Sequence, residues 1–267
     1  LTPRRRRRIV KTLGVIDVAC DLHGLGAEQA SRFSGKLASK SLRGQSLLNL
    51  LIRRVTEAER VDHVVAVFPK SEASRFRLTD LVPADVDTFV FDSSDPLKRI
   101  VAALNHYHGD AVVRVGLRSP FVDPALIDHL IDAAQREASL DYASYRLRDG
   151  NPAVLSHIGL FAEWCSVRAL QKMDRLGATP DERRELTRYF FAHADHFRLK
   201  LIPVPDIIDQ VDTRLTLEAM EDWELAEDIL DALGHDGLTC YNLADLVANH
   251  PRIRERMVAL NELNHVT

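Results

Sequence analysis

The chain has 267 residues, enough for one large domain with a small appendage. Hydrophobic residues make up 46% and charged residues 28%, a balance that excludes a disordered chain. The longest apolar runs, such as 64–68, are far too short to cross a bilayer, so we expect no membrane span. Three widely spaced cysteines form neither a disulfide framework nor a metal-binding knuckle, which favours a cytoplasmic protein.

Charge is distributed unevenly along the sequence. The chain holds 35 Lys and Arg against 39 Asp and Glu, a net charge of -4. Five of the cations form the arginine run at 4–8, which leaves 30 cations against 39 anions in the rest of the chain. A body of that sign is not expected to bind nucleic acid. The arginine run itself is either a solvated tail or a weak tether for a polyanion.

The first half of the chain alternates strand-like and helix-like segments. Runs of apolar and β-branched residues predict buried strands at 12–20, 61–68, 86–91 and 111–115. Apolar residues at helical spacing predict helices at 45–59 and 96–106. A further helix begins after Asp123, a favourable N-cap followed by Pro124. Such alternation favours a mostly parallel sheet with helices on both faces, an α/β fold.

The stretch 142–202 breaks this alternation. Strand-like segments at 142–145, 154–161 and 197–202 are separated by helical segments at 167–176 and 181–194. We therefore expect mixed or antiparallel strands in this section of the sheet.

The end of the chain is predicted to be helical. A long helix over 213–233 ends at Gly234, and two short amphipathic helices follow within 241–263, separated at Pro251. The predicted organisation is a basic tail at 1–10, an α/β domain at 11–234 and a helical C-terminal extension at 235–267.

The loop after the first predicted strand holds a candidate phosphate site, Ser31-Arg32-Phe33-Ser34-Gly35-Lys36. Ligands of α/β sheets bind at the carboxyl ends of the strands. The guanidinium of Arg32 offers a fork for phosphate, Lys36 a mobile charge, and Gly35 lets backbone N–H groups approach an anion. The spacing is not that of a P-loop, which argues against a Walker-type NTPase.

A second candidate site follows the strand at 111–115. Either Arg114 and Arg118 face an anionic ligand, or Arg114 pairs with a nearby carboxylate and Asp123 only caps its helix. A third candidate is Asp212, in Val211-Asp212-Thr213 before the last long helix. It is either a helix N-cap or a carboxylate of a metal or phosphate site.

Together these stretches resemble a known family, the spore-coat polysaccharide biosynthesis protein F type of cytidylyltransferase. That family has a first strand followed by Arg-Met-Gly-Ser-Thr-Arg-Leu-Pro-Gly-Lys, then Arg-Ile-Thr-Gly-Asp-Cys-Pro-Leu-Ile-Asp-Pro in mid-chain and Val-Asp-Thr-Pro-Glu-Asp near the end. The counterparts here are Ser31–Lys36, Arg114–Pro124 and Val211–Thr213, and the likeness runs in order from about 13 to 233. Asp95-Pro96-Leu97-Lys98-Arg99 is similar to the family's Asp-Val-Leu-Asp-Arg.

The resemblance implies a nucleotide-diphosphosugar-transferase-like domain that transfers CMP from CTP to a sugar, with Mg²⁺ and release of pyrophosphate, in surface-polysaccharide biosynthesis. By position, Arg32, Gly35, Lys36 and Arg114 would bind the nucleotide phosphates. Lys36 would act in catalysis, and Asp212 would be a metal-site carboxylate. Arg118 has no arginine counterpart in the family, but as a cation it would neutralise phosphate charge in catalysis. The expected partners are CTP and a sugar substrate.

The sequence also departs from the family pattern. The family's Gly-Asp pair in mid-chain reads Leu117-Arg118, so an arginine replaces the carboxylate expected to hold Mg²⁺. The family's Glu-His-Val-Thr reads Arg184-Glu185-Leu186-Thr187, which removes a histidine. A guanidinium about 4–6 Å from Mg²⁺ would cost roughly 5–8 kcal/mol at an effective dielectric constant of about 20. The alternative is therefore a catalytically impaired nucleotide- or sugar-binding scaffold.

Apolar residues in the 142–202 section also suggest a homodimer. The side chains that motivate this expectation are Phe161, Trp164, Phe190 and Phe191.

Overall fold

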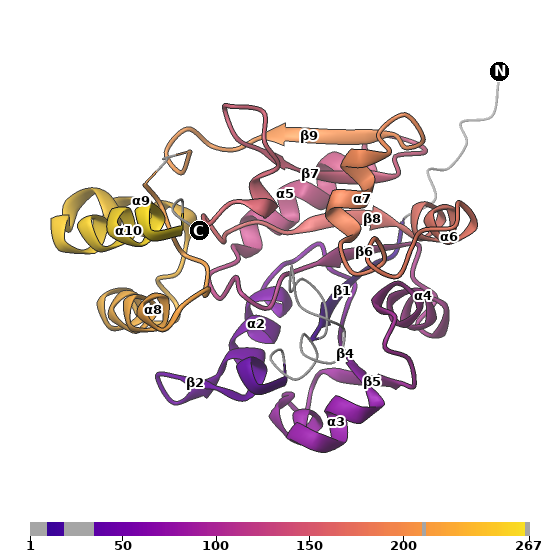
Figure 1. Cartoon of the computed structure of the whole chain (residues 1–267), viewed down its shortest axis with the longest axis horizontal. Coiled ribbons are helices and arrows are strands. Elements are labelled where there is room, and N and C mark those ends of the chain that lie inside the picture. The colour runs from indigo at the N-terminus through magenta and orange to yellow at the C-terminus, as the bar shows by residue number, and fades with distance from the viewer. Residues whose placement is uncertain (1–9, 19–34, 210–211, 265–267) are drawn as a thin grey trace.

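A seven-stranded mixed sheet forms the centre of the molecule (Figure 1). The structure, a computed structural model, describes residues 10–18, 35–209 and 212–264. The strand order is β5-β4-β1-β6-β8-β7-β9. The strands are β1 (Thr12–Asp17), β4 (His63–Pro69), β5 (Asp87–Phe91), β6 (Ala111–Arg114), β7 (Tyr142–Arg146), β8 (Glu163–Ser166) and β9 (Leu199–Pro203). A separate hairpin pairs β2 (Ser41–Leu42) with β3 (Gln45–Ser46).

Strand direction changes only at β8. Strands β5, β4, β1 and β6 run parallel, as do β7 and β9, whereas β8 is antiparallel to both of its neighbours. The expectation of mixed strands in the 142–202 section is therefore confirmed. Because β8 is antiparallel to β6, the first residue of β8 lies beside the last residue of β6, and Glu163 is in register with Arg114.

Helices cover both faces of the sheet, as the alternating sequence pattern predicts. Leu13 and Val15 of β1 pack in one apolar cluster, and Ile16 packs in the other, because successive strand residues point to opposite faces. The first cluster includes α4 (Pro96–His106), α6 (Val167–Arg175) and α7 (Leu186–Ala192). The second includes α2 (Leu47–Thr56), α3 (Lys70–Phe76) and α5 (Pro124–Gln135).

Helix starts follow the capping pattern of the sequence. The Asp95 carboxylate accepts a hydrogen bond from the Lys98 N–H at the start of α4. One Asp123 oxygen accepts the N–H groups of Ala125 and Leu126 at the start of α5, so the capping role predicted for Asp123 is confirmed. The sheet is also tied to α4 by a buried ion pair, in which Arg99 contacts both carboxylate oxygens of Asp17 at 2.9 and 3.0 Å.

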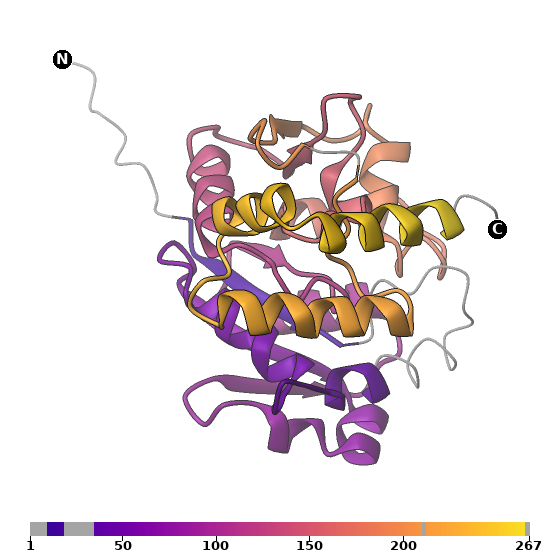
Figure 2. The ribbon, with the colours of Figure 1, turned by 90° about the vertical axis from the view of Figure 1, so that its left-hand side faces the viewer.

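The C-terminal helices pack on the face that holds α2 and α5. Figure 2 shows α8 (Met220–Leu233) and α10 (Pro251–Asn264) lying side by side, with α9 (Cys240–Asn249) next to them. Met257 of α10 is fully buried in the same cluster as the sheet. The second Asp123 oxygen accepts the Cys240 N–H at 2.5 Å, which fixes the start of α9. The two predicted helices on either side of Pro251 are confirmed, while the domain boundaries at 10 and 234 stay predictions.

The helix predicted over 213–233 begins seven residues later than expected. Residues 213–219 are irregular because their backbone bonds to other segments: the Leu215 N–H donates to the His157 carbonyl at 2.7 Å and the Leu217 N–H to the Arg118 carbonyl at 2.9 Å. The Asp222 carboxylate accepts the Glu218 and Ala219 N–H groups just before the helix starts.

Two other predicted elements are displaced. The strand predicted at 154–161 is wrong, because a short 3-10 turn, η2 (Ala153–Leu155), is followed by irregular chain up to β8. Gly159 has a φ of +67° and lies against the Leu215 carbonyl, which breaks the strand there. The helix predicted at 181–194 is confined to α7, because Arg183 is drawn into ion pairs with Asp95 and Asp174.

The aromatic residues that suggested a homodimer belong to the core. Phe161, Trp164 and Phe190 are each at most 4% exposed within the single chain, and Phe191 is partly buried against the α4 and α6 cluster. They supply no interface, and the homodimer stays a prediction. Within the residues described, no helix is long and apolar enough to cross a membrane.

Candidate functional site

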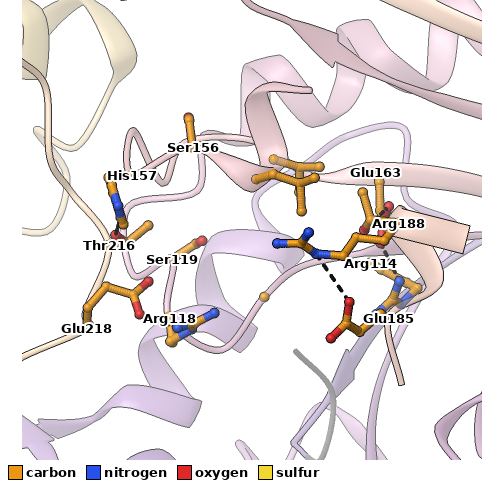
Figure 3. Close-up of a pocket in the computed structure, with 14 residues that line it drawn as sticks. Arg114, Arg118, Ser119, Ser156, His157, Glu163, Glu185, Arg188, Thr216 and Glu218 are labelled. Carbon is orange, nitrogen blue, oxygen red and sulfur yellow. Dashed lines mark hydrogen bonds and ion pairs between the residues drawn. The ribbon is translucent and has the colours of Figure 1, made fainter. Parts of the chain in front are cut away.

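A pocket of about 280 Å³ opens at the carboxyl end of β6, where ligands of α/β sheets bind (Figure 3). Five segments that are distant in sequence meet there. They are the end of β6 with its following loop, the stretch 154–157, the start of β8, the start of α7, and the irregular chain before α8. Its polar lining residues are Arg114, Arg118, Ser119, Ser156, His157, Glu163, Glu185, Thr187, Arg188, Thr216 and Glu218.

Three arginine–glutamate pairs line this pocket. Arg114 pairs with Glu163, and Arg118 pairs with Glu218. The Arg188 Nε lies 3.2 Å from the Glu185 Oε2, one turn apart at the start of α7. The pairs differ in access to solvent: the first is almost fully buried, whereas the Arg118 and Glu218 side chains are each 23% exposed. The pocket therefore presents three guanidinium groups, each balanced by a carboxylate.

The buried pair is fixed by a wider network. Besides Arg114, the Glu163 carboxylate accepts hydrogen bonds from the Tyr142 hydroxyl at 2.7 Å and the Thr187 hydroxyl at 2.8 Å. Burial, with the adjacent Glu163 charge, holds the pKa of Tyr142 well above its usual value, so this hydroxyl stays a donor. The network sets the orientation of the Arg114 guanidinium at the floor of the pocket.

The more exposed pair is held by the chain before α8. The Leu217 N–H donates to the Arg118 carbonyl, and the Glu218 N–H donates to the Asp222 carboxylate at 2.8 Å. Asp222 is in turn bound through both oxygens by Arg214, and both side chains are 1% exposed. A buried ion pair thus positions the backbone that carries Glu218.

His157 adds a neutral ring to the pocket. Its Nδ1 lies 3.3 Å from the Thr216 hydroxyl. Burial, reinforced by the Arg214 charge, lowers the pKa of His157 below its ordinary value of 6.5. The ring is therefore uncharged at neutral pH and can donate or accept a hydrogen bond to a ligand.

This shift gives His157 a measurable effect on stability. Because the folded protein binds the proton less readily than the unfolded chain, stability contributed by neutral His157 is present above pH 6.5 and is lost as pH falls through its lowered pKa. We expect the melting temperature of the wild type to fall relative to His157→Gln between pH 7.5 and pH 5. A constant difference over that range would contradict the lowered pKa.

The two arginines predicted after β6 both line the pocket. Arg114 also pairs with the Glu163 carboxylate, which was the alternative expected for this residue. Arg114 thus both lines the pocket and forms an ion pair. Arg32 lies outside the described residues. Lys36 is exposed on the helical segment 35–39, and Gly35 is buried beneath α3, where a Cβ would collide with the Phe76 ring. Packing alone thus favours glycine at 35, and the phosphate-binding roles of Gly35 and Lys36 stay predictions.

Asp212 does not face this pocket. Its carboxylate is bound by Arg254 of α10 at 2.7 Å and borders a second, more apolar pocket between the chain before α8 and α9. It does not cap α8 either, because that helix begins at Met220 and its N-cap residue is Ala219. Whether Asp212 lies near Arg32 and Lys36 stays a prediction, because Arg32 lies outside the described residues.

Comparisons with known proteins place the fold. A family model described as the MobA-like NTP transferase domain matches residues 25–189, more than half of the chain. The chain belongs to this family. It is 26% identical over 204 residues to spore coat polysaccharide biosynthesis protein SpsF of Bacillus subtilis, covering 73% of this chain and 81% of that one. The resemblance seen in the motifs is confirmed.

Other relatives extend over most of the chain. An uncharacterized protein of Methanocaldococcus jannaschii is 21% identical over 233 residues, covering 86% of this chain and 92% of the relative. A cytidylyltransferase from Leptospira borgpetersenii superposes with a TM-score of 0.71 at 16% identity, covering 91% and 95% of the two chains. CMP:2-keto-3-deoxy-manno-octonic acid synthetase in complex with CTP superposes with a TM-score of 0.58 at 10% identity, covering 83% of this chain and 99% of that one. These superpositions establish a cytidylyltransferase-like fold.

The described residues of this MobA-like domain do not fit Mg²⁺. Arg118 projects into the pocket where the family resemblance expects a carboxylate, and Asp212 is bound to Arg254 outside it. The three glutamates of the pocket are each paired with an arginine. No group of three His, Cys, Asp or Glu side chains within the described part of the chain is arranged to hold a metal ion. The role of Asp212 as a metal ligand stays a prediction.

The sequence analysis did not identify the glutamates that pair with the arginines of the pocket. Glu163 and Glu218 lie 49 and 100 residues from the arginines that they bind. A signal existed for Glu185 and Thr187, because both belong to the stretch that aligns with the family's Glu-His-Val-Thr. For Glu218 and His157 the sequence offered no comparable pattern.

The two cysteines that the structure describes, Cys165 and Cys240, are buried. Burial raises the pKa of Cys165 well above its usual value and, with the Asp123 charge, that of Cys240 to about 12. Because the thiolate is the reactive form, we expect neither thiol to react with a maleimide at pH 8 in a folded Cys20→Ser variant. Both should react after denaturation in urea. Labelling of the folded variant at the rate of the denatured one would contradict this assignment.

Proposed function

We propose that this protein is a nucleotidyltransferase that transfers CMP from CTP to a sugar in surface-polysaccharide biosynthesis and releases pyrophosphate. The observation that carries the proposal is the polar pocket at the carboxyl end of β6 in a MobA-like NTP transferase domain, with the guanidinium groups of Arg114 and Arg118 in its wall. Guanidinium groups bind phosphate oxygens through paired hydrogen bonds and keep their charge at any physiological pH.

The reaction needs positioning and charge stabilisation more than covalent help from the protein. A sugar hydroxyl oxygen attacks the α-phosphorus of CTP, the bond from that phosphorus to the bridging oxygen of the β-phosphate breaks, and pyrophosphate leaves. The hydroxyl proton passes to solvent. In this proposal, Arg114 and Arg118, which both line the pocket, stabilise the charge that develops on the phosphate oxygens. The neutral ring of His157, with the hydroxyls of Ser156 and Thr216, can hydrogen-bond the sugar.

A pyrophosphate-release assay tests this function. The protein is incubated with each of the four nucleoside triphosphates and a panel of neutral and acidic sugars, in the presence and absence of Mg²⁺. We expect release of pyrophosphate with CTP, together with a CMP-sugar identified by mass spectrometry. Background release with every nucleotide and sugar would contradict nucleotidyl transfer.

A second candidate function is nucleotide or sugar binding without transfer. The pairing of Glu218 with Arg118 and of Asp212 with Arg254 favours it, because each carboxylate in the described lining of the pocket is then engaged by an arginine rather than by a metal ion. Calorimetry separates the two functions when it is run beside the assay. Binding of CTP with no pyrophosphate release would support this second function.

A further inference from the structure

We propose that the pocket at the end of β6 binds a nucleoside triphosphate without a divalent cation, because Arg118 supplies the positive charge that a metal ion would otherwise bring. The inference rests on the proposed function in one respect, namely that the ligand is a nucleoside triphosphate. It concerns how this chain's own side chains balance the phosphate charge.

The charge pattern of the pocket favours an anion that arrives without a metal. Arg114 and Arg118 lie four residues apart, at the end of β6 and in the loop that follows, and both line the pocket. A divalent cation entering there would have to separate a glutamate from its arginine, whereas a phosphate can compete with the glutamates for the guanidinium N–H donors.

The acidic groups of the pocket are engaged in holding those arginines. Glu163 is bound by Arg114, Tyr142 and Thr187, so it has little capacity left for a metal ion. For Glu218 to coordinate a cation, its ion pair with Arg118 would have to break, and two like charges would then share the space. Within the residues that the structure covers, no acidic cluster offers the cation another place.

The Arg118 pair is suited to meeting a ligand. Its side chains are partly exposed at the pocket wall, whereas the Arg114 pair is buried beneath it. The Glu218 N–H donates to the Asp222 carboxylate at 2.8 Å, and this anchor limits the directions in which the paired Arg118 guanidinium can point. We therefore assign Arg118 to direct phosphate contact and Arg114 to the electrostatic field behind it.

Calorimetric titration of CTP into the full chain tests the inference, once with EDTA and once with millimolar Mg²⁺. We expect the wild-type dissociation constant to differ by less than about threefold between the two conditions, because the arginines already neutralise the phosphates. Glu218→Gln, which removes the competing carboxylate, should bind CTP more tightly in EDTA.

Arg118→Asp sharpens the test, since it places a second carboxylate beside Glu218. This variant should bind CTP at least about tenfold more weakly than the wild type in EDTA and should recover affinity when Mg²⁺ is added. Arg43→Asp is the matched control, because it makes the same change of charge at an exposed pair with Asp231 and lies outside the pocket lining. It should leave both dissociation constants unchanged.

The outcomes separate the inference from the proposed function. Tightening of wild-type binding by about tenfold or more on addition of Mg²⁺ would overturn the inference and leave nucleotidyl transfer standing. If neither the four nucleotides nor tripolyphosphate binds in either condition, both proposals fall. Binding in EDTA without pyrophosphate release in any condition would support the inference and reject transfer. Should Arg118→Asp fail to fold by circular dichroism, the wild-type comparison alone decides.

Discussion

Arg214→Ala is expected to lower the free energy of unfolding by about 3–5 kcal/mol, because it leaves the Asp222 carboxylate buried without its cation. Both side chains are 1% exposed, and the guanidinium meets the carboxylate through Nε at 2.6 Å and Nη2 at 2.9 Å. Urea denaturation followed by circular dichroism measures the change. The loss is large relative to the total stability of an ordinary domain.

The matched control is Arg256→Ala on α10. Arg256 pairs with Asp228 and Glu224 of α8, but all three side chains are exposed, and exposed pairs contribute at most about 1 kcal/mol. Equal destabilisation by the two variants would contradict a special role for the buried pair. We also expect the loss of the buried pair to disturb the pocket, because the Asp222 carboxylate accepts the Glu218 N–H.

Arg118→Ala is expected to reduce kcat/KM for pyrophosphate release by about 10²–10³-fold, a loss of about 3–4 kcal/mol in transition-state stabilisation. The physical reason is that the variant removes a guanidinium aimed at developing phosphate charge while leaving the fold intact. Rates are measured with CTP and the sugar that gives the highest turnover.

Arg53→Ala provides the comparison for this loss. Arg53 pairs with Asp85 on the surface of α2, and it does not line the pocket. It should keep kcat/KM within about threefold of the wild type, the scatter expected when no contact to the reacting groups is lost. If Arg118→Ala is as active as Arg53→Ala, Arg118 does not stabilise the transition state.

Local patterns predicted most of the fold. The helix at 96–106 and the cap at Asp123 follow from signals within a few residues, and both match the structure. The start of the last long helix does not, because residues 213–219 read as a helix locally. Instead, the N–H groups of residues 215 and 216 donate to the His157 carbonyl, and that of residue 217 donates to the Arg118 carbonyl. Tertiary hydrogen bonds overrode the helical propensity of that segment.

For a related reason, the sequence indicated the arginines of the site but not the carboxylates that pair with them. Arg114 and Arg118 could be identified because they follow a predicted strand. Their carboxylate partners depend on the antiparallel register of β8 beside β6 and on the path of the chain before α8. Asp212 matched a family motif, yet its contact with Arg254 comes from α10, a helix that lies beyond the motif. Spacing along the chain does not encode these contacts.

A crystal structure of the protein with CTP is the most direct test of the account. We expect the triphosphate in the pocket at the end of β6, with phosphate oxygens within hydrogen-bond distance of the Arg118 guanidinium and near Arg114. Density for the nucleotide at the groove that borders Asp212 and Arg254 instead, with the Arg118–Glu218 pair untouched, would contradict it.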